Sequence, residues 1–162
     1  MVCKDTRMRN IKNNFTAFLN EYTFDSTMYW YPLCSLRKKI DVVAYQMDSI
    51  YKNGDIGQIE NVLRAYGIEY VISVQMQSRG DELHEVDLYK LLYKKDRDGY
   101  TFPWNIETYY FDDSREWMIY VSHEGTITFT EKRLVQCAKE NMSGKYLYAY
   151  YTFYILFDLN FS

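Results

Sequence analysis

The chain contains few of the residues that usually build disulfides, metal sites and catalytic centres, with 3 cysteines and 2 histidines among 162 residues. Cys3, Cys34 and Cys137 lie far apart and form no CxxC pair, so neither a disulfide framework nor a zinc site is indicated. The start, MVCKDTRMRN, lacks the apolar core of a signal peptide. Both features predict a reducing compartment and a cytoplasmic protein.

Long basic stretches and phosphate-binding loops are also missing. The formal net charge is −3, whereas nucleic-acid-binding domains usually carry a basic stripe, so the sequence predicts no nucleic-acid partner. The 7 glycines match no GxGxxG or GxxxxGK[ST] pattern, and no metal-ligand spacing occurs, so no cofactor is predicted. The longest apolar run, residues 146–157, has 12 residues, too few to cross a membrane as a helix.

Aromatic residues, in contrast, are abundant at 19%, and 18 of them are tyrosines. Tyrosine combines an apolar ring with a hydroxyl, which suits broad β-surfaces and also contact surfaces for another protein. Because strands are naturally enriched in aromatics, the structural interpretation is favoured, although composition alone does not separate the two.

Apolar periodicity predicts helices over 8–20, 36–51, 55–66 and 131–142. In 36–51, which Ser35 would cap, the apolar residues recur at helical spacing over four turns. Asp55 and Gln58 have the spacing of a capping box, and Gly67 occupies a helix C-cap position. Thr130 would cap the last helix. The expected helical core face consists of Ile40, Val43, Met47, Ile59 and Leu63.

Strands are predicted over 68–76, 107–111, 117–122 and 126–129, with polar turns between the last three and a polar loop over 78–85. The expected sheet residues are Val71, Ile72, Val74, Tyr109, Phe111, Trp117, Ile119, Val121, Ile127 and Phe129. The sequence therefore predicts a single α+β domain over 1–162, in which an antiparallel sheet packs against two or three helices.

The aromatic tail, residues 145–162, shows neither helical nor strand periodicity. A fully buried central strand is one interpretation. A segment covered by a partner is the other, because such a stretch would aggregate if exposed.

His123 and Glu124 are the only residues that suggest an acid–base pair. A polar hairpin turn is the favoured explanation, since neighbouring strand residues point to opposite faces and could share a site only through a turn. Cys137 lies on the apolar side of its predicted helix, which indicates a buried, inert thiol, and Cys34 precedes a helix that could lower its pKa. A small hydrolase or transferase using His123 therefore remains an alternative, without an assigned catalytic residue.

The segment WMIYVSHEGTITF, residues 117–129, resembles the C-terminal hairpin of small uncharacterised bacterial proteins of toxin-immunity type. The resemblance implies a non-catalytic protein that binds a partner, such as a toxin, through surface complementarity. It covers about 25 residues and excludes the aromatic tail.

The main functional hypothesis is accordingly an intracellular protein-binding module, in its most specific form an immunity-type inhibitor that occludes its partner. Aromatic anchors would fill a pocket while charged residues steer the approach. The predicted contacts are Tyr29, Trp30, Tyr31, Trp104, Tyr109, Tyr110, Asp112, Asp113, His123 and Glu124. A homo-oligomer assembled through 145–162 is a further alternative.

Overall fold

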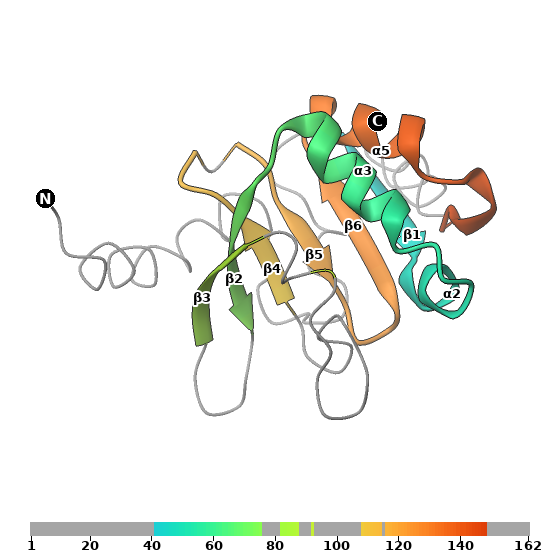
Figure 1. The fold of residues 1–162 in the computed structure, drawn as a ribbon, viewed down its shortest axis with the longest axis horizontal. Helices are drawn as coiled ribbons and strands as arrows, with labels where there is room; N and C mark the ends of the chain where they lie inside the picture. The colour runs from blue at the N-terminus through green and yellow to red at the C-terminus, as the bar shows by residue number, and fades with distance from the viewer. Residues whose placement is uncertain (1–40, 76–81, 88–91, 93–107, 115, 149–162) are drawn as a thin grey trace, which may run out of the picture.

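The computed structural model describes residues 41–75, 82–87, 92, 108–114 and 116–148 (Figure 1). In these residues one antiparallel sheet packs against three α-helices, so the predicted single α+β domain is confirmed. The strands are β1 (Val42–Gln46), β2 (Tyr70–Gln75), β3 (Glu82–Asp87), β4 (Thr108–Phe111), β5 (Ile119–Val121) and β6 (Thr126–Thr130). The helices are α2 (Met47–Lys52), α3 (Gly57–Tyr66) and α5 (Lys132–Asn141), followed by a 3-10 turn, η1 (Gly144–Tyr146).

The six strands lie in the order β1-β6-β5-β4-β2-β3, and every neighbouring pair is antiparallel. β4, β5 and β6 form the meander that the sequence predicts. β1 pairs with the distant β6, with Val43 opposite Phe129. The first and last described strands are therefore neighbours, and the two longer helices, α3 and α5, pack against each other on the sheet (Figure 1).

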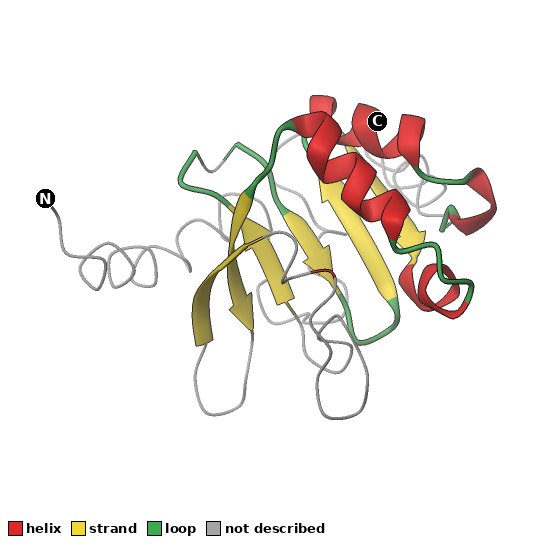
Figure 2. Ribbon diagram, viewed as in Figure 1, coloured by secondary structure: helices red, strands yellow, loops and turns green. Residues whose placement is uncertain are grey.

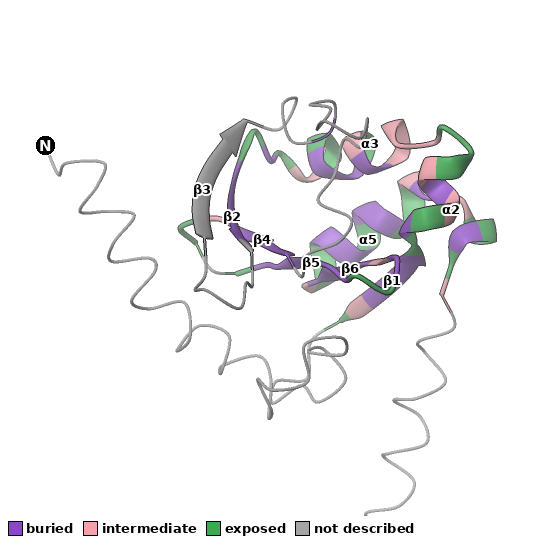
Figure 3. Ribbon diagram, turned by 90° about the horizontal axis from the view of Figure 1, so that it is seen from below, coloured by how far each residue is buried: buried purple, intermediate pink, exposed green. Residues whose placement is uncertain are grey.

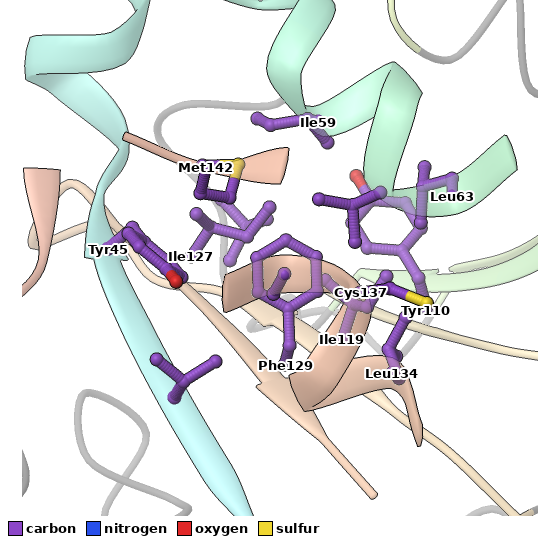
Figure 4. Close-up of a cluster of buried hydrophobic side chains, with 14 of the residues drawn as sticks. Tyr45, Ile59, Leu63, Tyr110, Ile119, Ile127, Phe129, Leu134, Cys137 and Met142 are labelled. Carbon is purple, nitrogen blue, oxygen red and sulfur yellow. The ribbon is translucent and has the colours of Figure 1, made fainter. Parts of the chain in front are cut away.

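The helices gather on one face of the sheet (Figures 2 and 3). Because successive side chains on a strand point to opposite faces, alternate residues of each strand reach this helical layer. The ring of Phe129 meets that of Tyr45 edge-to-face, with centroids 6.2 Å apart, among buried side chains of α3 and α5 (Figure 4). Burial of this apolar surface is the main source of the fold's stability.

The other face of the sheet is buried as well. Its side chains come from the intervening positions, namely Ala44, Ile72, Val74, Tyr109, Phe111 and Tyr120. Tyr109 and Tyr120 lie opposite each other with ring centroids 4.7 Å apart. Burial on both faces explains why all four residues of β4 are buried.

The predicted helix over 36–51 is wrong for residues 42–46, which form β1, and only Met47–Lys52 are helical. Val43 and Ala44 were expected to lie on the same face of a helix. In β1 their side chains instead point to opposite faces of the sheet, and both are buried. Pairing with β6 gives this β-branched segment a complete partner strand, and that tertiary contact outweighs the helical spacing.

Three other local predictions are also corrected. Residues 82–85 were assigned to a polar loop but belong to β3. The capping box at Asp55 is not formed: Ile56 is the N-cap of α3, and Gln58 Oε1 accepts instead from Ser143 N at 2.7 Å. Glu131, not Thr130, caps α5, because the Thr130 hydroxyl bonds to Met118 N and O.

Several predictions are confirmed. Gly67 ends α3 with φ at +96°, a left-handed conformation that favours glycine. The strands predicted over 68–76 and 107–129 agree with β2 and the meander to within a few residues, and nine of the ten expected sheet residues lie in strands. The exception is Trp117, which is buried but precedes β5. The predicted helix over 8–20 and most of the aromatic tail lie outside the described residues.

Candidate functional site

The predicted contact residues that the structure describes do not gather in one place. Asp112 and Asp113 lie in the turn between β4 and β5, whereas His123 and Glu124 lie in the turn between β5 and β6. The two turns are separated by the length of β5 and lie at opposite ends of the sheet (Figure 1). Four other predicted aromatic anchors are not among the described residues: Tyr29, Trp30, Tyr31 and Trp104.

Tyr109 and Tyr110 are not surface anchors, since each is only 1% exposed. They lie next to each other in β4, so one ring enters the layer beneath the helices and the other enters the opposite face. Burial raises the pKa of the Tyr110 hydroxyl, whose hydrogen bond with Thr108 opposes that shift. The sequence analysis expected both tyrosines to contact a partner, whereas β4 is an interior strand buried on both sides.

The turn after β4 is organised by Asp112. Its Oδ1 accepts from Ser114 N at 2.9 Å and from the Ser114 hydroxyl, and its Oδ2 accepts from Trp117 Nε1 at 3.0 Å. Both carboxylate oxygens therefore shape the turn. Asp113, Ser114 and Glu116 are exposed around it.

Two tyrosines lie at the same end of the sheet. Tyr66, the last residue of α3, meets Trp117 edge-to-face at 6.1 Å, and the Arg133 guanidinium lies 4.9 Å from the Tyr66 ring centroid. Tyr70 begins β2 two residues before Ile72, which pairs with Phe111 at the end of β4. The Tyr70 side of β2 therefore adjoins the turn that Asp112 organises.

We call this region the Tyr70 end: Asp41, residues 66–70, the backbone of Asp87, residues 112–114 and 116–117, and residues 131–133. Hydrogen bonds and strand pairing connect its parts, since Glu131 N donates to Asp41 O at 3.0 Å and Asp87 pairs with Tyr70. Its described side chains include six acidic residues and two basic ones. The acidic residues are Asp41, Glu69, Asp112, Asp113, Glu116 and Glu131, and the basic ones are Lys132 and Arg133.

Glu131 holds α5 in place at this end. It adopts φ 80° and ψ 140°, a conformation that residues other than glycine rarely take. Its carboxylate accepts from Arg133 N at 2.9 Å and from Leu134 N at 3.0 Å, which satisfies two amides at the start of the helix. Desolvation, followed by the charge of Glu131, raises the pKa of Tyr66 to about 12, so this phenol stays neutral at physiological pH.

The turn between β5 and β6 has the geometry of a polar hairpin. Glu124 N donates to Ser122 Oγ at 2.9 Å, and Gly125 N donates to Ser122 O at 3.1 Å. His123 Nε2 lies 3.2 Å from Glu124 Oε1, with 45% and 58% of the two side chains exposed. A contact this exposed contributes little in water and offers no desolvated site for acid–base chemistry.

Other reactive groups in the described chain are poorly placed for catalysis. Burial is the largest cause that raises the pKa of the Cys137 thiol, which disfavours the reactive thiolate. Within residues 41–75, 82–87, 92, 108–114 and 116–148, no group of three or more His, Cys, Asp or Glu side chains could hold a metal ion. The same residues contain no helix long and apolar enough to span a membrane.

A small polar cluster joins the start of α3 to η1. The Tyr146 hydroxyl donates to Asp55 Oδ2, and Lys145 Nζ lies 3.2 Å from the same oxygen. The hydrogen bond from Tyr146, and then that from Lys145, hold the pKa of Asp55 below its ordinary value of 3.8. The cluster connects η1 to the start of α3. It belongs neither to the turn between β4 and β5 nor to the turn between β5 and β6.

This lowered pKa makes the stability contribution of Asp55 depend on pH. The contribution is fully present above the ordinary pKa of 3.8 and is lost as pH falls from there through the lower folded-state value. We therefore expect Asp55→Asn to destabilise the protein at neutral pH and the difference to shrink below about pH 4. Urea unfolding at neutral and acidic pH would measure it, and a difference that stays constant into strong acid would contradict it.

Comparisons of the chain with protein families, with curated proteins and with solved structures found no match.

Sequence reasoning missed Tyr70 and Tyr66. Tyr70 was assigned to a strand and Tyr66 to a helix, and both assignments are correct. The sequence signal for both residues was their position on the two sides of the helix–Gly–strand junction. Side chains at the end of a helix or the start of a strand can reach solvent. Tyr70 is 57% exposed as a result.

Proposed function

We propose that the protein is a protein-binding module that captures a basic partner through the Tyr70 end. The exposure of Tyr70 carries this proposal, because the residue is 57% exposed at an end of the sheet whose described charged side chains are mostly acidic. Exposed tyrosine is enriched among the residues that dominate binding energy at protein interfaces. Tyr66 and Trp117 support this end from beneath, so the surface is held in place before binding.

The excess of acidic side chains indicates the kind of partner. Carboxylates around an aromatic anchor attract a positively charged surface and accelerate encounter. They also disfavour acidic partners through like-charge repulsion. A cationic protein surface is therefore the partner class that fits this end.

The resemblance of residues 117–129 to toxin-immunity proteins narrows the proposal. In this narrower proposal the protein is an immunity-type inhibitor that acts inside the cell and covers the functional surface of a basic toxin. Trp117, the first residue of that segment, lies at the Tyr70 end and bonds to Asp112. The mechanism is occlusion, so no covalent chemistry is required of this chain.

The test is a capture experiment from the cells that make the protein, with tagged wild-type protein and two charge-reversed variants. Asp113→Lys/Glu116→Lys alters the Tyr70 end, and Glu124→Lys/Glu140→Lys makes the same change in net charge elsewhere on the exposed surface. We expect one partner to be retained by the wild type and the second variant and lost by the first. Equal retention by both variants, or loss with both, would contradict the assigned surface.

For a partner captured in this way, Tyr70→Ala should weaken binding at least tenfold, about 1.4 kcal/mol, because the aromatic contact area is lost. Stability should change little, because the side chain is mainly exposed. Titration calorimetry would measure the affinity, with Tyr51→Ala as a matched tyrosine on α2, away from this end. Unchanged affinity in Tyr70→Ala would remove the anchor from the proposal.

A further inference from the structure

One guanidinium already lies on an aromatic ring of the Tyr70 end. Arg133, in the first turn of α5, places its Cζ atom 4.9 Å from the ring centroid of Tyr66, the last residue of α3. This distance is within the range of a cation–π contact. Trp117 meets the same ring edge-to-face, with centroids 6.1 Å apart, which helps to hold the ring in position. The Tyr66 ring therefore receives a guanidinium from the chain itself.

Arg133 is held there weakly. Its side chain is exposed, and within the described part of the chain its guanidinium forms no ion pair. The guanidinium of Arg64, in contrast, lies 2.7 Å from the carboxylate of Glu60. An exposed cation–π contact alone is equivalent to about a two- to fivefold change in a binding constant, so a second guanidinium can displace Arg133.

A carboxylate near the same ring has no cationic partner among the described residues. Desolvation and the charge of Glu131 raise the pKa of Tyr66 to about 12, and the charge of Glu116 adds to this shift. The exposed Glu116 carboxylate therefore lies within electrostatic range of the Tyr66 hydroxyl. Both carboxylate oxygens of Glu131 already accept from backbone amides of α5. Glu116 is thus the carboxylate with which an incoming cation would pair.

We propose that the Tyr66 ring and the Glu116 carboxylate form a binding site for an arginine side chain of the partner, which displaces Arg133. The incoming guanidinium stacks on the ring as Arg133 does, and it gains the ion pair with Glu116 that Arg133 does not make. Arg133 moves into solvent and loses one exposed contact. Because the site belongs to the Tyr70 end, this inference rests on the proposed function and identifies the partner residue that this end recognises.

The chemistry of the site favours arginine over lysine. A guanidinium is planar and weakly hydrated, so it stacks on an aromatic face and can bond to a carboxylate through two N–H groups at once. An ammonium is compact and strongly hydrated, so it loses more hydration on reaching the same ring. The ligand class is therefore the guanidinium group.

Titration of the full chain with capped Arg-Gly-Arg and Lys-Gly-Lys peptides tests the site without the natural partner. We expect the arginine peptide to bind more tightly and to shift the NMR signals of the Tyr66 ring and of the Trp117 indole N–H. Equal binding of the two peptides, or no shift of these signals with the arginine peptide, would overturn the proposal.

Arg133→Ala tests the displacement, and Lys132→Ala is the control because it makes the same change in charge at the neighbouring exposed residue. Arg133→Ala keeps the backbone amide that bonds to Glu131, so the start of α5 should be retained. We expect it to raise the affinity for the arginine peptide about two- to fivefold, because no cation has to leave the ring, and Lys132→Ala to raise it less. An equal increase in both variants, or no increase in Arg133→Ala, would overturn the displacement.

Glu116→Gln should weaken binding of the arginine peptide about two- to fivefold. Glu124→Gln makes the same change at the opposite end of the sheet and should leave binding unchanged. Equal effects of the two variants would overturn the role of Glu116. Failure of the arginine peptide to bind overturns this inference even where a partner is captured through the Tyr70 end. Arginine binding without a captured partner supports the inference and contradicts only the proposed function.

Discussion

Replacing Trp117 by alanine is expected to lower the free energy of unfolding by about 3–5 kcal/mol. The side chain is 1% exposed and its ring packs against Tyr66, so alanine would leave a large cavity between α3 and the sheet. Loss of the Nε1 bond to Asp112 would also loosen the turn after β4. Chemical denaturation, followed by circular dichroism, measures the effect.

Trp117→Phe is the matched control, because phenylalanine keeps an aromatic ring in the core but cannot donate to Asp112. Its expected cost is roughly 1–2 kcal/mol, from a smaller cavity and one lost hydrogen bond. If alanine and phenylalanine destabilised the protein equally, the hydrogen bond rather than core packing would dominate, contrary to this account.

Gly125→Ala should destabilise the protein by about 2 kcal/mol. Gly125 has φ at +74° in the turn between β5 and β6, where an L side chain is strained. A Cβ atom there would also lie 2.6 Å from Asp48 Cγ, so the Asp48 carboxylate would have to move. The turn must stay in place, because Gly125 O accepts from Met47 N at 2.8 Å at the start of α2.

Two controls separate backbone strain from crowding. Gly57→Ala, in the first turn of α3 with no atom near its Cβ position, should be neutral or stabilising by about 0.5–1 kcal/mol. In an Asp48→Ala background the crowding is removed, so Gly125→Ala should cost only the strain of its backbone, about 1–2 kcal/mol. A negligible cost for Gly125→Ala in the wild-type background would contradict the strained turn. Unfolding curves of the four variants provide the comparison.

Local patterns predicted those elements in which sequence spacing and tertiary contacts agree. The meander from 107 to 129 has polar turns at the right intervals, and α3 ends at Gly67, where only a left-handed residue fits. β1 was missed because Val43, Met47 and Ile50 have helical spacing, while the strand depends on β6, which lies more than 80 residues later in the sequence. Long-range pairing of this kind leaves no local signal.

The candidate site was predictable only in part. The acidic turn at Asp112 and Asp113 was identified, but the sequence could not show that it lies at the opposite end of the sheet from His123. Nor could it show that Tyr109 and Tyr110 are enclosed on both faces, since that depends on the strand order. The exposure of Tyr70 could not be predicted either, because it follows from where β2 begins relative to β4.

The most direct test of the proposed binding surface is to map the captured partner's footprint by amide chemical-shift changes on labelled protein. The account predicts changes centred on residues 67–70 and 112–117, with little change in the turn formed by residues 122–125. A footprint centred on residues 122–125, or no shift at saturating partner, would contradict it.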